Sequence, residues 1–291
     1  MWAIVINPIS GGGQGAVRGR EVAGYFSSHG LKYTIVTANS AEKLHVNLES
    51  FLNGLGNEGC EGVVAVGGDG LAHLVIQSVA PRKIPFTVIP AGTGNDLVRS
   101  LKWKLNAITE QLDFVTQNKA TPIDLGLVDS EWFGAILSTG FDSVVNERAN
   151  TLSWPKGPMK YNVAIALELP KFKPIEYSIE LDTQELQVEA MLIAVANGSS
   201  YGGGMQVCPD ASMKDGLFDV MVLHPVSKIE FMKVFPKVFK GAHTDHPQVR
   251  IYRSAKVSIS SSAIAYADGE RIGGLPVRAE CMAGAGLSWT P

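Results

Sequence analysis

The sequence predicts an α/β N-terminal domain with a parallel sheet covered by helices, followed by a C-terminal antiparallel β-sandwich. Strand-like and helix-like segments alternate over the first 110 residues, which is the pattern of a helix-covered parallel sheet. Near residue 123 the pattern changes to short alternating strands separated by turn residues, which is typical of an antiparallel sandwich or barrel. With 291 residues the chain is long enough for two cores, and we assign residues 1–122 and 123–280 to them.

The N-terminal elements follow from apolar runs whose period switches between strand and helix. Strands are predicted over residues 2–7, 32–37, 62–66 and 85–89. Helices are predicted over residues 16–29, 41–55, 72–79 and 96–101. Ligands of parallel sheets bind beyond the carboxyl ends of the strands, so the glycine-rich loops 8–15, 67–70 and 90–94 are expected at one edge.

The C-terminal elements are short runs in which apolar and polar residues alternate. Strands are predicted within residues 123–128, 131–139, 175–181, 187–197, 217–224, 249–261 and 263–272. Two helical segments interrupt them, at residues 159–171 and 229–240.

The segment 229–240 has an amphipathic pattern. Its lysines, Lys233, Lys237 and Lys240, are predicted on the face opposite an apolar arc, and Pro236 weakens a continuous helix. The arc consists of Ile229, Phe231, Met232, Val234, Phe235, Val238 and Phe239. We expect this arc to pack on the protein core, and contact with an anionic bilayer is the alternative.

Composition argues against several classes of protein. A formal charge of −3 and a pI near 6.1 give no positive surface for nucleic acid. The chain opens on a strand-like run with no charged and apolar leader, and no apolar run reaches about 20 residues. The odd number and wide spacing of Cys60, Cys208 and Cys281 argue against a disulfide framework. We therefore expect a cytoplasmic protein.

The six histidines form no metal-binding pair. Surface positions are expected for them, as in the loop-like stretch that holds His243 and His246. His73 differs from the others only in its place at the start of a helix, three residues after a glycine-rich turn.

Glycine-rich turns between strand and helix give the strongest functional signal. Glycine has no Cβ and a helix N-terminus favours negative charge, so backbone N–H groups at such a turn can approach a phosphate. Residues 7–15 could wrap a phosphate with these groups and the Ser10 hydroxyl, and a flexible surface turn is an equal alternative. The turn Gly67-Gly68-Asp69-Gly70 is more specific, because its carboxylate can orient a ribose, a metal-bound water or a hydroxyl nucleophile.

Two further motifs carry carboxylates. Gly92-Thr93-Gly94-Asn95-Asp96 supplies a hydroxyl, N–H groups and an acid at a helix start, where Asn95 or Asp96 can equally serve as a helix cap. Asp268-Gly269-Glu270 would present two carboxylates side by side at the end of a strand, although Asp-Gly is also a common hairpin turn. Paired carboxylates suit base catalysis and metal-assisted phosphoryl transfer.

Taken in order, these motifs resemble the diacylglycerol kinase-type catalytic domain, a family of lipid kinases that includes sphingosine kinases and is related to NAD kinases. The resemblance runs over nearly the whole chain. Besides the turns above, it includes Asn7-Pro8, Gly140-Phe141-Asp142, Asn197-Gly198, Gly202-Gly203-Gly204, Pro209, Ala211, Asp215-Gly216 and Asp219-Val220.

This resemblance implies a NAD kinase/diacylglycerol kinase-like fold, with a cleft between two domains where ATP and a lipid hydroxyl meet, and with residues 281–291 returning to the first domain. It implies that Glu270 is the general base, supported by Asp268. The residues it implies in nucleotide binding are Asn7, Pro8, Ser10, Gly11, Thr37, residues 67–73 with Gly67, Gly68, Asp69 and Gly70, and Thr93, Gly94, Asn95 and Asp96.

The resemblance also implies Mg²⁺. A structural ion is expected at Ser212, Asp215 and Leu217, where the first and last would give backbone carbonyls, and such oxygen ligands suit a hard cation. Asp124 matches a carboxylate that the family uses in a water-mediated metal network beside the phosphates.

One stretch departs from many family members. Leu71, Ala72, His73 and Leu74 stand where those members carry a threonine and a polar or acidic helix start, so a hydroxyl and a carboxylate are missing. Sphingosine kinases also carry leucine after this turn, so activity is still expected, and the contacts to nucleotide are left open.

We therefore predict an ATP- and Mg²⁺-dependent kinase that phosphorylates a hydroxyl of a lipid, such as diacylglycerol or a sphingoid base, at a membrane surface. A kinase of a soluble substrate, as in NAD kinases, is one alternative. A nucleotide-binding regulatory protein without catalysis is the other. The acceptor lipid and the oligomeric state, a homodimer included, stay open.

Overall fold

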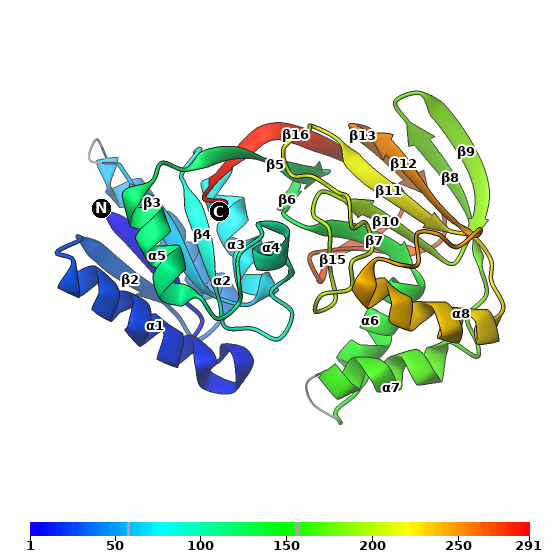
Figure 1. Ribbon diagram of the computed structural model, residues 1–291, viewed down its shortest axis with the longest axis horizontal. Coiled ribbons are helices and arrows are strands. Elements are labelled where there is room, and N and C mark those ends of the chain that lie inside the picture. The colour runs from blue at the N-terminus through cyan, green and yellow to red at the C-terminus, as the bar shows by residue number, and fades with distance from the viewer. Residues whose placement is uncertain (57–58, 155–157) are drawn as a thin grey trace.

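The structure, a computed structural model, describes residues 1–56, 59–154 and 158–291 (Figure 1). Its N-terminal strands pair in parallel in the order β2-β1-β3-β4. These strands are β1 (Trp2–Ile6), β2 (Tyr33–Thr37), β3 (Gly62–Gly67) and β4 (Phe86–Pro90). All residues of β1, β3 and β4 are buried, as expected for parallel strands covered on both faces.

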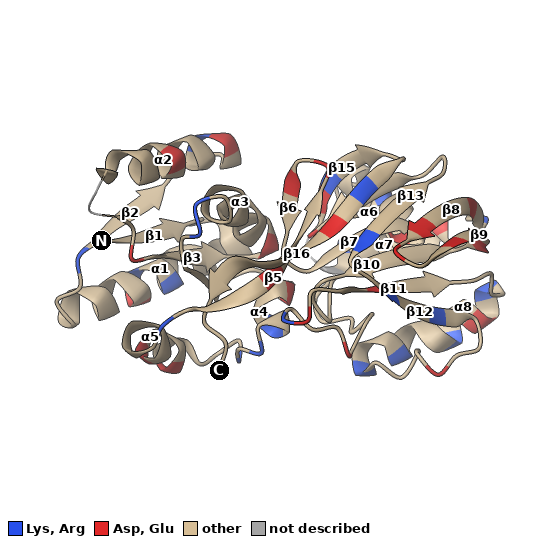
Figure 2. Ribbon diagram, turned by 90° about the horizontal axis from the view of Figure 1, so that it is seen from above, with Lys and Arg blue, Asp and Glu red and all other residues tan. Residues whose placement is uncertain are grey.

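Helices cover both faces of this parallel sheet, as the two views in Figures 1 and 2 show. One face carries α1 (Ser10–Ser28) and α5 (Ile108–Gln117), and the other carries α2 (Ala41–Gly54) and α3 (Asp69–Val79). The short α4 (Asp96–Ser100) follows β4. The predicted α/β class is confirmed, and α5 is a helix that the sequence analysis did not predict.

Strand β16 (Val277–Ser288) connects the N-terminal sheet to the rest of the protein. It pairs in antiparallel fashion with β5 (Thr121–Val128), and its Ser288 lies opposite Phe86 of β4 in parallel register. Beyond it, Trp289 stacks on Trp2 with a centroid distance of 5.7 Å. One sheet therefore runs through both parts of the chain, and the division at residue 122 stays a prediction.

The C-terminal half is an antiparallel sandwich. One layer is the far half of the shared sheet, in which β16 is followed by β13 (Lys256–Ser260), β8 (Ile175–Leu181) and β9 (Gln184–Ala190), with β6 (Glu131–Phe133) beside β5. The other layer has the order β12-β11-β10-β7-β14-β15. Its strands are β7 (Ile136–Gly140), β10 (Leu192–Ala196), β11 (Phe218–Leu223), β12 (Val249–Ser254), β14 (Ile264–Ala267) and β15 (Glu270–Gly274). Phe133 and Phe218 stack between the layers at 5.6 Å.

Helices α6 (Phe141–Thr151), α7 (Pro158–Glu168) and α8 (Lys228–Val234) cover the outer face of the six-stranded layer. Successive side chains of β10 point to opposite faces of this layer, so one strand contributes to two cores. Ile193 belongs to the core between the two layers, and Ala194 belongs to the core beneath the helices. Helix α6 was not predicted. None of the helices in the described residues has the length and apolar character needed to cross a membrane.

The predicted helix 229–240 is divided in two. Helix α8 ends at Val234, and a 3₁₀ helix follows over Phe235–Lys240 with Pro236 in its first turn. Proline has no N–H group to donate and its ring clashes with the preceding turn, which explains the break.

Candidate active site

The three glycine-rich turns meet at the carboxyl edge of the parallel sheet, as predicted. A Cβ atom built on Gly92 would lie 2.5 Å from the Cα of Gly68, and one built on Gly11 would overlap the carbonyl oxygen of Ala91. Gly11 also has a φ of 55°, which L side chains rarely adopt. Close backbone approach therefore requires glycine at these positions.

The carboxylate of Asp69 connects the second turn to the third. It accepts hydrogen bonds from the backbone N–H groups of Asn95 (2.7 Å) and Asp96 (2.6 Å), at the start of α4. Neither Asn95 nor Asp96 caps this helix with its own side chain, so the capping role considered for them is wrong. Asn95 instead holds its own loop, because its side chain donates to the carbonyl of Gly92 and accepts from that residue's N–H.

The carboxylate of Asp96 connects the third turn to the C-terminal part of the chain. It accepts hydrogen bonds from the N–H groups of Gly203 (2.8 Å) and Gly204 (2.7 Å). Both glycines have positive φ values, which let consecutive N–H groups face one carboxylate. Asp69 and Asp96 thus link three loops in sequence.

This arrangement gathers negative charge. Burial, together with the neighbouring charge of Asp96, raises the pKa of Asp69 to about 6. Burial also raises the pKa of Asp96. The hydrogen bonds from backbone N–H groups act in the opposite direction and do not compensate fully. Two buried carboxylates with raised pKa values therefore lie at this edge.

The two carboxylates of the Asp268-Gly269-Glu270 turn have different surroundings, although they were expected side by side. The Asp268 side chain is 6% exposed. It accepts hydrogen bonds from the N–H groups of Gly134 (2.7 Å), Ala135 (2.8 Å) and Ile136 (3.2 Å). Glu270 is exposed, and a Cβ built on Gly70 would lie 3.0 Å from its Oε1 atom. Asp268 therefore anchors the turn, and Glu270 reaches the second glycine turn.

His73 lies within the residues 67–73 that the resemblance implies in nucleotide binding, and the surface position expected for the histidines is wrong for it. It is 5% exposed and bridges two carboxylates, with Nε2 2.9 Å from Glu131 Oε1 and Nδ1 3.4 Å from Asp268 Oδ2. Burial disfavours its charge, but the hydrogen bonds and charges of Asp268 and Glu131 outweigh that effect and raise the pKa of His73 to about 9. The surface expectation is also wrong for His243, which is buried with Nε2 3.0 Å from the carbonyl of Val207.

Asp124 holds the predicted metal loop. Its carboxylate accepts from the N–H groups of Gly216 (2.7 Å) and Gly284 (2.8 Å). In the same loop Asp215 forms an ion pair with Arg253 and accepts from the N–H of Leu217, while the hydroxyl of Ser212 accepts from the N–H of Lys214. The donor types fit a hard cation, but one carboxylate oxygen of Asp215 already has a cationic partner.

An apolar cavity of about 220 Å³ lies beside the first glycine turn. Pro8 and Thr37, both predicted to contact nucleotide, line it together with Ile6, Ala16, Gly19, Arg20, Ala23 and Ile35. Two of these lining residues contact each other, because the hydroxyl of Thr37 donates a hydrogen bond to the carbonyl of Ile6 at 3.0 Å. Asn7 orders the turn, because its Oδ1 accepts from the N–H of Ile9.

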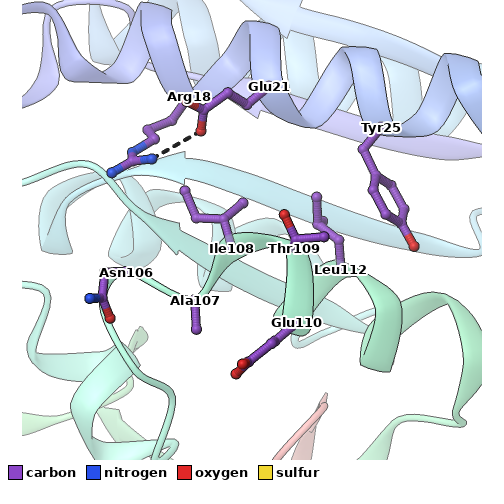
Figure 3. Close-up of a pocket in the computed structure, with 9 residues that line it drawn as sticks. All are labelled: Arg18, Glu21, Tyr25, Asn106, Ala107, Ile108, Thr109, Glu110 and Leu112. Carbon is purple, nitrogen blue, oxygen red and sulfur yellow. Dashed lines mark hydrogen bonds and ion pairs between the residues drawn. The ribbon is translucent and has the colours of Figure 1, made fainter.

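A second cavity, of about 450 Å³, separates α1 from the start of α5 (Figure 3). Arg18, Glu21, Tyr25 and Glu110 are among its lining residues, and none of the predicted site residues lines it. Arg18 is already paired with Glu21 at 3.0 Å, so its charge is compensated there. The candidate site is the edge where the glycine turns meet the Asp268–Glu270 turn.

Comparison with known proteins gives two family matches. The description "Diacylglycerol kinase catalytic domain" matches residues 1–128. The description "YegS C-terminal NAD kinase beta sandwich-like domain" matches residues 135–286. A diacylglycerol kinase of Mycobacterium tuberculosis (strain ATCC 25618 / H37Rv) is 33% identical over 271 residues, covering 91% of this chain and 86% of the relative. The chain belongs to the diacylglycerol kinase catalytic domain family.

Two further proteins are similar to this chain. A diacylglycerol kinase of Bacillus subtilis (strain 168) is 32% identical over 262 residues, covering 88% of this chain and 83% of the relative. The crystal structure of a diacylglycerol kinase from Bacillus anthracis str. Sterne superposes with a TM-score of 0.72, covering 100% of this chain and 96% of that chain at 18% identity. The second likeness supports the fold alone.

Sequence reasoning found the family's glycine turns but missed several partners. No motif pointed to Glu131 as the partner of His73, and Gly203 and Gly204 were noted without their bonds to Asp96. A weak signal for His73 existed, since it is a titratable residue in the first turn of a helix that starts at the site.

Proposed function

We propose that the protein transfers the γ-phosphate of ATP, with Mg²⁺, to a hydroxyl group of a lipid such as diacylglycerol or a sphingoid base. The observation that carries this proposal is the approach of Glu270 to Gly70, which brings an exposed carboxylate to the turn expected to hold phosphate. Within the described residues the side chain of Glu270 has no hydrogen bond or ion pair, so its oxygens are free to accept a proton.

The nucleotide would follow the loops at the sheet edge. The apolar cavity beside Pro8 and Thr37 suits an adenine ring, with Asn7, Ser10 and Gly11 next to it. The N–H groups of the glycine turns and the start of α3 would face the phosphates. Asp69 and Asp96 hold these loops in contact, and Thr93 and Gly94 lie in the third loop.

Mg²⁺ fits the charge distribution of the site. The raised pKa values of Asp69 and Asp96 indicate carboxylates without full compensation. Asp124, Ser212, Asp215 and Leu217 offer further oxygen atoms in the loop that Asp124 anchors. When bound, the ion would offset charge on the phosphate oxygens during transfer.

The chemical step assigns a role to each end of the Asp268–Glu270 turn. Glu270 accepts the proton of the lipid hydroxyl while that oxygen forms a bond to the γ-phosphorus and the bond from this phosphorus to ADP breaks. The products are a phosphorylated lipid, ADP and a protonated Glu270, which returns its proton to water. Asp268 holds the turn through the hydrogen bonds that it accepts from three N–H groups.

The test is transfer of labelled γ-phosphate from ATP and Mg²⁺ to detergent-dispersed lipids and to soluble alcohols that include NAD, with Glu270→Gln as the comparison. We expect a labelled lipid in the native protein and turnover about 10²–10⁴ times lower in the variant. Label on NAD alone would indicate a kinase of a soluble substrate. Binding of ATP without any transfer would contradict catalysis and favour a regulatory protein.

A further inference from the structure

The segment after β11 exposes three large apolar side chains that were expected to pack on the core. Ile229 is 71% exposed, Met232 56% and Phe239 48%. The core contacts come from the other side of the segment, where Phe231 packs on Phe141 and on Phe235 with centroid distances of 5.1 and 5.7 Å. The predicted apolar arc is therefore wrong for the three exposed residues, because the break at Pro236 and the position of Phe231 turn them to solvent.

Lysines are exposed along the same segment. Lys233, Lys237 and Lys240 are all exposed and are interspersed with the exposed apolar residues along the segment. Figure 2 shows these basic positions along α8 and the 3₁₀ helix after it. The side chain of Glu230, the single acid of α8, is 45% exposed and lies 3.1 Å from His246 Nε2. The segment thus carries exposed positive charge and exposed apolar groups together.

We propose that this docking stripe, consisting of Ile229, Met232, Lys233, Lys237, Phe239 and Lys240, binds the surface of an anionic lipid bilayer. Apolar side chains at an interface insert at the boundary between headgroups and acyl chains, while lysines attract anionic headgroups. A protein partner would more often meet apolar residues separated from a charged rim. This proposal rests on the proposed function. It adds the surface from which the lipid would reach the candidate site.

The stripe is connected to the candidate site through α7. Lys228, next to the stripe, donates to the carbonyl of Phe172, which lies just after α7. Near the other end of α7, burial and the charge of Glu270 raise the pKa of Tyr161. Met159 and Leu167 of the same helix are also exposed. Exposed apolar side chains therefore continue from the stripe onto α7.

The test is sedimentation of the full chain with vesicles in the absence of ATP, so that its result does not depend on kinase activity. Vesicles of phosphatidylcholine alone are compared with vesicles that also contain phosphatidylglycerol. One variant combines Ile229→Ser, Met232→Ser and Phe239→Ser, and another combines Lys233→Gln, Lys237→Gln and Lys240→Gln. The matched control, Lys43→Gln with Val46→Ser, changes an exposed lysine and an exposed apolar residue of α2.

We expect the native protein and the control to bind the anionic vesicles, and each stripe variant to bind at least about ten times more weakly. Binding by the lysine variant should also lose most of its dependence on salt. Equal binding by all four proteins, or no binding by the native protein, would overturn the proposal. A change from dimer to monomer in the stripe variants, with vesicle binding retained, would assign the stripe to a second copy of the chain instead.

A kinetic arm separates this proposal from the proposed function. Turnover of a short-chain lipid below its critical micelle concentration should be equal in the native protein and the stripe variants. Turnover of the same headgroup in anionic vesicles should fall with vesicle binding. Loss of activity on both forms would show that the substitutions damage the site, and would contradict a role confined to docking.

Discussion

Glu131 Oε1 lies 2.9 Å from His73 Nε2, and this contact joins β6 to the helix that follows the second glycine turn. The other ring nitrogen of His73 faces Asp268, which anchors the turn that carries Glu270. One buried imidazole therefore holds α3, β6 and the β14–β15 turn in a common arrangement.

The first prediction concerns the pH dependence of stability. The pKa of His73 is about 9 in the folded protein and 6.5 is its ordinary value. The charged form therefore contributes stability that is fully present below about pH 6.5 and is lost as the pH rises through about 9, with a size on the order of 3 kcal/mol. We expect His73→Gln to have a flatter thermal midpoint between pH 7 and 9.5 than the native protein. His29→Gln, at an exposed position, is the control, and parallel curves for all three proteins would contradict the ion pairs.

A second prediction separates the two carboxylates of one turn. Asp268→Asn would replace one acceptor oxygen by an N–H₂ group that faces backbone N–H donors, so the free energy of unfolding should fall by about 1–3 kcal/mol. Glu270→Gln should leave the thermal midpoint nearly unchanged, because that side chain is exposed. Denaturant unfolding measures the difference. Equal destabilisation by the two substitutions would show that the turn is not anchored through Asp268.

A third prediction concerns the contact between glycine turns. Gly92→Ala would place a methyl group 2.5 Å from the Cα of Gly68 and force the two turns apart. We expect ATP affinity to fall by about tenfold or more, since misplaced N–H groups lose phosphate contacts. Gly24→Ala is the matched control, because nothing lies within 4 Å of a Cβ there and alanine favours a helix interior. Calorimetric titration of ATP would show the difference, and unchanged affinity in Gly92→Ala would exclude these turns from phosphate binding.

A fourth prediction follows from the crowded carboxylates. The pKa of Asp69 is about 6 in the folded protein and 3.8 is its ordinary value. Ionisation therefore costs stability, and this cost grows as the pH rises from about 4 to about 6. We expect the thermal midpoint of Asp69→Asn, relative to the native protein, to rise over that interval. At pH 7, Mg²⁺ with ATP should raise the thermal midpoint of the native protein more than that of the variant. A difference in midpoint between the two proteins that stays constant from about pH 4 to about pH 6 would contradict a raised pKa of Asp69.

Local sequence signals were sufficient for the strands and most helices of the α/β part, although not for α5, and for the Asp268-Gly269 turn. Strand–helix alternation and glycine spacing are properties of neighbouring residues, so they predicted the loops that meet at Gly68 and Gly92. The Asp268-Gly269 turn was likewise recognisable, with φ values of 51° and 89° in the structure.

Hydrogen bonds between residues far apart in the chain could not be predicted from the sequence. Asp69 caps a helix 26 residues away, and His73 meets a carboxylate 195 residues away, so no window of the chain contains both partners. The prediction that the apolar residues of 229–240 pack on the core was partly wrong for a related reason. Which residues of a short helix are buried depends on its contacts, here those of Phe231 with Phe141, and hydrophobicity alone put Ile229 and Met232 on the wrong side.

The position of β16 in the chain has a consequence for biosynthesis. This strand pairs with β4, β5 and β13, yet it is translated after all of them. While the ribosome is still adding residues 277–288, the edges of β4 and β13 that it will occupy lack their partner, and such unpaired edges promote association between chains. These edges therefore stay open during synthesis until residues 277–288 have left the ribosome.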